Sequence, residues 1–336
     1  MSNGYGDITS RLGAHAETKM LEHAEPILVL NKLGDHKPMP KNKGETIKFR
    51  RPVPLAAALT PLTEGVRPAA TNFRYVDVNA TLQQHGAWME LTDKVADLHE
   101  DPVGSDMAMM AGEQAAETIE LVTHGKLIAG TNVIYANGTA RNQVNTPLNI
   151  RMQRLAVRSL MGQRAKRITS VLSGSTMVGT APIEAAYVAV CHTDIVSSIR
   201  KMPDFVPVAK YGNRQPICAE EVGSVEDVRY IASPLFNSWV NAGGAHGGTA
   251  ISTGGTSADI YPVLFLGAKA FGVIALKGSK DAGGAIKPMV RQPGSPSFGD
   301  ELGQSGSVAW KTWYTAKILN DAWMVRGEVA ASVDPT

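Results

Sequence analysis

The sequence predicts an α+β fold, in which helices and strands occupy different stretches of the chain. Three patterns support this class: two strand-like runs between residues 46 and 91, a long helical pattern between residues 101 and 129, and short strands with loops after residue 173. The 336 residues are enough for a substantial core and two subdomains. Apolar runs recur throughout, so the 33 glycines and 19 prolines indicate turns and long loops, not disorder.

The segment 46–91 is predicted to be an extended β-hairpin with a Pro- and Gly-rich tip. Its first run is Thr46–Leu55, and its second run begins at Asn72 and continues toward Leu91. A two-stranded arm has too little core to be stable alone in water, and its open edges invite pairing with another chain. We therefore expect the arm to complete its packing on a neighbouring subunit.

Two helices are predicted in the middle of the chain. Asp101 as N-cap and Pro102 at the first helical position begin a long helix that ends near Ala129. Its buried stripe is predicted to be Ala108, Ala111, Ala115, Ile119 and Val122. Thr146 and Pro147 are predicted to begin the second helix. Its inner face is predicted to be Met152, Leu155, Ala156 and Leu160.

Short strands and loops follow from about residue 173. Ala186–Cys191 has the pattern of a buried strand, and residues 241–256 have the composition of a surface loop. At the C-terminus, Val308–Leu319 and Ala322–Val329 flank a turn and predict a hairpin.

Charge is distributed unevenly, although the formal net charge is only +2. No acidic residue occurs between Leu121 and Ile183, whereas that window holds many basic ones. Such a positive face is a possible site for a polyanion, and pairing with acidic segments of neighbouring subunits is the open alternative. The basic residues of interest are Arg151, Arg154, Arg158, Arg164, Lys166 and Arg167.

Motifs for catalysis, cofactors and metals are not found. The stretch 243–248 lacks the order of a phosphate-binding loop, and Gly303–Gly306 falls short of a nucleophile elbow. Cys191 and Cys218 are distant in sequence, which predicts free thiols and no metal spacing. We expect no catalytic residue, no metal, no cofactor, no transmembrane helix and no secretory signal.

Four stretches, taken in order, carry a resemblance to a known family: Thr46–Arg51, Leu62–Pro68, Asp259–Pro262 with Gly267, and Lys311–Asp321. Their order is similar to that of the major capsid proteins of tailed bacteriophages, which have the Hong Kong 97-type fold, and in particular resembles the podovirus-like phage capsid family. The resemblance implies an N-terminal arm at 1–45 and an extended hairpin loop at 46–91. It also implies a peripheral domain at 92–175 and 300–336, with the long spine helix, and an axial domain at 176–299.

The function implied is that of a major capsid protein in the virion, assembled in the host cytoplasm. Copies would form hexamers and pentamers of an icosahedral shell around double-stranded DNA, with portal, scaffolding and decoration proteins as further partners. No motif identifies a covalent Lys–Asn cross-link, and we expect none. The arm residues expected to meet the neighbouring subunit are Arg50, Arg51, Glu64, Arg67, Phe73 and Tyr75, with Trp88 as a further apolar anchor. The basic surface from the window without acidic residues would face the DNA and bind it without sequence specificity.

Two other readings stay open. An encapsulin-like nanocompartment shell has the same fold and encloses protein cargo instead of DNA. An α/β enzyme that binds a ligand with the Gly-rich loop at 241–256 belongs to a different class, and it would form a small oligomer with a saturable site.

Overall fold

The computed structural model describes residues 28–37, 39, 42, 44–53, 55–62, 64–98, 100, 102–172, 180–212, 214–275, 286–294, 296 and 299–333. Most of the expected N-terminal arm lies outside these residues. Its described part contains a single helical turn, α2 (Leu30–Leu33), and a short strand, β1 (Asp35–His36).

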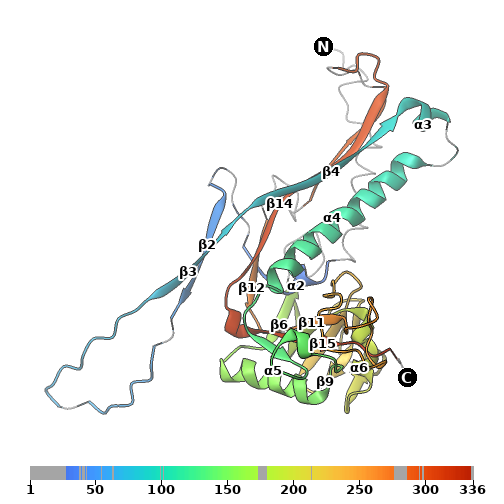
Figure 1. Ribbon diagram of the computed structural model, residues 1–336. Coiled ribbons are helices and arrows are strands. Elements are labelled where there is room, and N and C mark those ends of the chain that lie inside the picture. Colours follow the sequence, from blue (N-terminus) through green and yellow to red (C-terminus); the bar gives the residue numbers. More distant parts are fainter. Residues whose placement is uncertain are drawn as a thin grey trace.

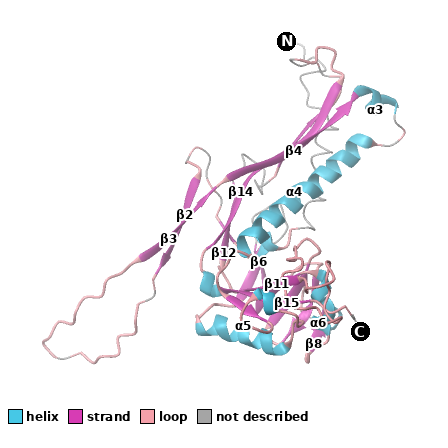
Figure 2. Cartoon of the chain, in the orientation of Figure 1, coloured by secondary structure: helices cyan, strands magenta, loops and turns pink. Residues whose placement is uncertain are grey.

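The expected extended hairpin is confirmed. Strand β2 (Thr46–Pro52) pairs antiparallel with β3 (Tyr75–Thr81), from Thr46 opposite Thr81 to Pro52 opposite Tyr75. The arm projects away from the rest of the chain, and its tip is a long loop (Figures 1 and 2). At its base, Phe49, Ala80 and Leu82 are buried in one apolar cluster with Ile274, and this cluster anchors the arm to the body.

A five-stranded sheet continues from the arm. Strand β4 (Gln83–Thr92) follows β3 after Leu82 and pairs antiparallel with the long strand β14 (Ser305–Ile318). Strands β12 (Phe271–Ala275) and β13 (Lys287–Arg291) also pair with β14, and β1 pairs parallel with β12.

The long helix is confirmed as α4 (Val103–Leu127), which runs beside β4 and β14 (Figure 1). Pro102, predicted as the first helical residue, is instead the N-cap, so the helix begins one residue later than expected, and Asp101 lies outside the described residues. The stripe Ala108, Ala111, Ala115 and Ile119 is buried as predicted, and Val122 is half-buried. Three of these alanines pack with Val308 and Trp310 of β14, because small side chains let the helix approach the sheet closely. A short helix, α3 (Asp93–Leu98), joins β4 to α4.

A second, eight-stranded sheet forms the compact part of the molecule. Its order is β5 (Val133–Tyr135), β15 (Met324–Ala330), β11 (Ile260–Leu266), β7 (Thr180–Cys191), β10 (Val228–Ala232), β9 (Glu221–Val225) and β8 (Phe205–Pro207), with β6 (Ile168–Leu172) paired to β7. Helix α5 (Ile150–Gly162) packs on it through Met152, Ala156 and Leu160, and α6 (Val196–Arg200) through Ile199. None of the described helices is long and apolar enough to cross a membrane.

The predicted C-terminal hairpin is wrong. Strands β14 and β15 belong to different sheets: β14 pairs with β4, β12 and β13, whereas β15 pairs with β11 and β5. The 3-10 turn Asp321–Trp323 between them carries the chain from one sheet to the other. Every residue of β11 is buried, so β15 gains more stability by completing the sheet of β11 than it would by pairing with β14.

Two details of α5 also differ from the prediction. The N-cap is Asn149, whose side chain accepts a hydrogen bond from the Met152 N–H at 2.9 Å. Pro147 stays extended and forms a bridge with Ala330, so the helix begins three residues later than expected. Leu155 is exposed and not on the inner face, which Met152, Ala156 and Leu160 occupy.

Sheet membership follows the expected domain boundaries only in part. Strands β12 and β13 lie within the expected axial segment 176–299 but pair with β14. Strands β5, β6 and β15 lie in the expected peripheral segments but belong to the eight-stranded sheet. The division into peripheral and axial domains stays a prediction, and these pairings are where its boundaries depart from the sheets.

Candidate assembly surfaces

The tip of the arm is an exposed apolar surface. Leu55, Leu59, Leu62 and Val66 are 56–87% exposed, and they lie in a loop with little hydrogen bonding among described residues. Contiguous apolar surface of this kind marks interaction sites on soluble proteins. The expected contact residues include none of these four, although their apolar character beside Pro54 and Pro61 is visible in the sequence.

Three expected contact residues come together near the start of the tip. The Arg50 guanidinium donates to both carboxylate oxygens of Asp77, at 2.8 and 3.0 Å, and this hydrogen bonding lowers the pKa of Asp77. Arg50 also lies over the Tyr75 ring at 5.3 Å, and Phe73 meets Tyr75 edge to face with ring centroids 4.8 Å apart. Arg50 is thus occupied within its own chain, while Phe73 remains 56% exposed.

The other expected contact residues of the arm lie apart from this group. Arg51 lies 5.5 Å from the Trp323 ring of the body. Glu64 and Arg67 are exposed in the tip, and neither has an ion-pair partner among the described residues. Trp88 lies on β4 and is 66% exposed.

The basic face centres on α5. Arg151, Arg154 and Arg158 are exposed on this helix, and Arg164, Lys166 and Arg167 follow its end. Two of the six are paired with the turn between β9 and β10: Arg154 donates to Glu226 at 2.9 Å, and Arg167 to Asp227 at 2.6 Å. The other four have no ion pair within the part of the chain that the structure describes. The charge pattern of the sequence does not distinguish these two groups, because the pairing joins residues 60 or more positions apart.

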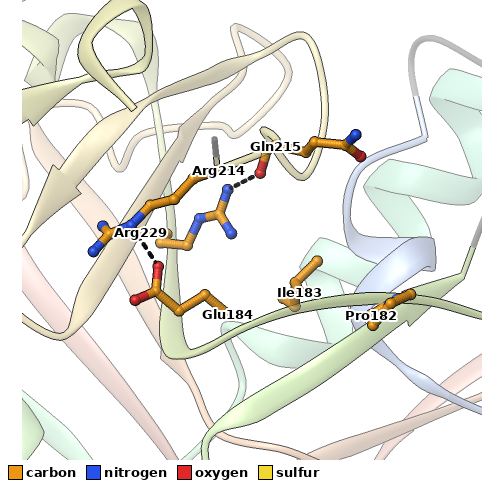
Figure 3. Close-up of a pocket in the computed structure, with 6 residues that line it drawn as sticks. All are labelled: Pro182, Ile183, Glu184, Arg214, Gln215 and Arg229. Carbon is orange, nitrogen blue, oxygen red and sulfur yellow. Dashed lines mark hydrogen bonds and ion pairs between the residues drawn. The ribbon is translucent and has the colours of Figure 1, made fainter. Parts of the chain in front are cut away.

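A polar pocket lies beside the eight-stranded sheet, lined by Pro182, Ile183, Glu184, Arg214, Gln215 and Arg229 (Figure 3). Both arginines that line the pocket already have partners within the chain. Arg214 pairs with Glu184 at 2.7 Å, and Arg229 donates to the Gln215 carbonyl at 2.7 Å and pairs with the buried Glu221. An anionic ligand would therefore compete with existing carboxylates.

The Gly-rich loop 241–256 does not line that pocket. The buried carboxylate of Asp259 holds the loop by accepting hydrogen bonds from the N–H groups of Asn241 and Thr253 at 2.8 and 2.9 Å.

Burial raises the pKa of the Cys191 thiol to about 12, and it raises the pKa of the Cys218 thiol to about 12 as well. Among the described residues, no cluster of His, Cys, Asp or Glu has the arrangement of a metal site.

Comparison with known proteins places the chain in a family. The family model described as phage capsid protein matches residues 75–327, well over half of the chain. The chain belongs to this family. It is a capsid protein that builds a phage shell, and its place is the virion.

The individual relatives agree. The major capsid protein of Pseudomonas phage KPP21 is 22% identical over 293 residues, which cover 80% of this chain and 72% of that protein. The capsid of Ralstonia phage GP4 has a TM-score of 0.64 at 13% identity, with 91% of this chain and 89% of that chain covered. The expected Hong Kong 97-type capsid fold is confirmed by such neighbours.

An encapsulin shares the fold as well. The SrpI encapsulin of Synechococcus elongatus PCC 7942 has a TM-score of 0.51 at 9% identity, over 89% of this chain and 86% of that chain. At this identity the likeness concerns the fold alone, and the phage family assignment stands.

Proposed function

We propose that the chain is the major subunit of an icosahedral phage shell, in which the β2–β3 arm of each copy packs on a neighbouring copy. The observation that carries this proposal is the exposed apolar tip of the arm, with Leu59 and Leu62 at 87% and 79% exposure. An arm of this composition gains most of its stability by burying that surface against another chain.

The copies would associate as hexamers and pentamers, assembled in the host cytoplasm with scaffolding, portal and decoration proteins. The role is structural and not enzymatic, which the family assignment supports. A closed shell repeats each interface many times, so each contact can be modest in strength.

Deletion of residues 56–69 tests the arm. We expect a soluble, folded subunit that forms no normal particles in negative-stain micrographs, because the buried base of the arm is retained while its apolar tip is lost. A matched control is Val240→Ser, which removes an exposed apolar side chain from a different surface and should leave particle formation intact. Normal particles from the deletion variant would refute the proposed role of the arm.

The partner of the basic face is proposed to be packaged double-stranded DNA. Arg151, Arg158, Arg164 and Lys166, which have no ion pair among the described residues, are exposed and gathered on and after α5. Contacts of this kind go to phosphates, so they carry no sequence information and weaken as salt increases.

A further inference from the structure

Strands β3 and β4 follow each other with only Leu82 between them, and they pair with different partners. At the two ends of β3, the Leu82 N–H donates to the Glu45 carbonyl and the Val53 N–H donates to the Arg74 carbonyl, both at 2.9 Å. Even-numbered residues of β3 therefore direct their backbone groups toward β2. At the end of β4, the Asp93 N–H donates to the Gln304 carbonyl at 2.8 Å, so odd-numbered residues of β4 face β14.

Alternate residues of a strand direct their backbone groups to opposite edges, so β2 and β14 lie on opposite edges of the run formed by β3 and β4. The edge of β4 that faces away from β14 is then uncovered. The pairing with β2 stops at Thr46, opposite Thr81, just before β4 begins, and no other described strand pairs with that edge. The residues that direct N–H and C=O groups to this edge are Gln84, Gly86, Trp88, Glu90 and Thr92. Proteins usually protect such an edge with proline, several charges or a bulge, and β4 has one charged residue and regular pairing.

The side chains along this edge add an apolar contact surface. Ala87 and Met89 pack toward α4, so the intervening Trp88 lies on the opposite face of the sheet, where it is 66% exposed. A strand added to the edge of β4 would gain backbone hydrogen bonds and an aromatic neighbour together.

The arm contains a segment without backbone hydrogen-bond partners among the described residues. Residues 66–74 run without a turn into β3, and within residues 69–73 the structure shows no backbone hydrogen bond to a described residue. Phe73 of this segment is 56% exposed. The other leg of the tip suits a strand less well, since it has three consecutive alanines and a tight turn in which the Leu59 N–H donates to the Ala57 carbonyl.

The two features cannot meet within one chain, because the arm projects away from β4 (Figure 1). We propose that residues 69–73 of one copy add as a strand to the free edge of β4 in a neighbouring copy, with Phe73 beside Trp88. This inference rests on the proposed function, in which the arm packs on a neighbour, and it assigns the surface that receives it.

Glu90→Pro tests the added strand. The Glu90 N–H points to the free edge, so proline there removes no hydrogen bond to β14 but places its ring where the incoming strand must lie. The matched control Glu90→Ala loses the same side chain and keeps the N–H. We expect both subunits to melt at similar temperatures, and the proline variant to yield particles about tenfold less well or worse than the alanine variant, since a contact is lost at every copy. Equal particle yields would overturn the proposal.

A second measurement does not depend on how the proline variant folds. In full-length chains with p-benzoylphenylalanine in place of Trp88, irradiation of assembled particles should join position 88 to residues 69–73 of another copy. Cross-links instead to residues 1–27, or to a part of the neighbour outside the arm, would show a different occupant of the edge and overturn the proposal.

The role of the arm in assembly and the addition of its strand to β4 are distinguished by different outcomes. If the deletion of residues 56–69 prevents assembly while Glu90→Pro assembles like Glu90→Ala, the arm functions in assembly but does not add to β4. If that deletion gives normal particles, the proposed role of the arm itself is wrong.

Discussion

At the scale of single residues, the buried carboxylate of Glu120 is the most unusual group in the described chain. It lies on α4, fully buried, and its Oε1 atom accepts the Leu30 N–H of α2 at 2.7 Å. Burial raises the pKa of Glu120 to about 7, against the opposing effect of the α2 backbone hydrogen bonds. One turn later, burial lowers the pKa of His124 to about 4, so this ring is neutral at pH 7 and offers Glu120 no positive charge.

Glu120→Gln should change how stability depends on pH. The folded-state pKa of about 7 lies above the usual value of 4.5, so the wild-type contribution is fully present below about pH 4.5 and is lost as the pH rises through 7. Glutamine carries no charge at any pH, so its stability relative to wild type should increase between about pH 5 and pH 8.5, by on the order of 1–3 kcal/mol. Chemical denaturation of the subunit at both pH values measures the difference.

The exposed Glu117 on the same helix supplies the control. Glu117→Gln should shift stability by less than Glu120→Gln and without the same dependence on pH. A Glu120→Gln variant whose stability relative to wild type is the same at both pH values would show that this carboxylate does not prefer its protonated form in the folded chain.

At the scale of elements, α5 combines a buried apolar face with a basic face whose members differ in their surroundings. Arg154 is held by Glu226, whereas Arg151 and Arg158 have no ion pair among the described residues. An arginine that already has a carboxylate partner has less to offer a phosphate, because binding must first replace that pair.

Replacing Arg151 and Arg158 together by glutamine should therefore weaken DNA retention more than Arg154→Gln does. We expect filled particles of the double variant to release their DNA at lower temperature and lower salt, because two counterion-releasing contacts per copy are lost. A dye-release melt at several salt concentrations, with packaged genome length measured in parallel, makes the comparison. Unchanged genome length and release in the double variant would remove DNA as the partner of α5.

At the scale of the whole molecule, the arm and the two sheets form three structurally distinct parts of the subunit. The eight-stranded sheet holds the largest buried cluster, and the five-stranded sheet with α4 links it to the projecting arm (Figure 1). A body with its own core can present an arm that has little core, and in the proposed shell a neighbouring copy would bury the exposed tip of that arm.

Particles purified from infected cells should contain double-stranded DNA that resists added nuclease, because a closed shell excludes the enzyme. Extracting the particles after nuclease treatment and digesting the extract with DNase identifies the content. A protein cargo in place of DNA would favour the interpretation as a nanocompartment shell over the interpretation as a phage capsid.

Much of the architecture was predictable because it depends on spacing within a single segment. The stripe from Ala108 to Ile119 recurs at helical intervals, and Thr46–Pro52 has a strand pattern that needs no distant partner to be recognised. The exposure of Phe73 follows from the same reasoning, since an arm of two strands cannot bury its own side chains.

At α5 the N-cap moved within one segment, from Thr146 to Asn149, but the other features that the sequence did not predict are contacts between distant segments. The pairing of β15 with β11, the ion pair of Arg154 with Glu226 and the hydrogen bond from Leu30 to Glu120 join residues 58 to 90 positions apart. Local composition cannot predict such partners, because many segments present similar faces and packing selects among them.

The sequence by itself was therefore sufficient to predict the extended hairpin and the long helix, since each is a local property. Which arginines are already paired, which sheet takes the last strand and which edge of β4 stays open emerged only when the chain was folded. Those properties belong to pairs of segments, and a pair is specified by the packing of the folded chain.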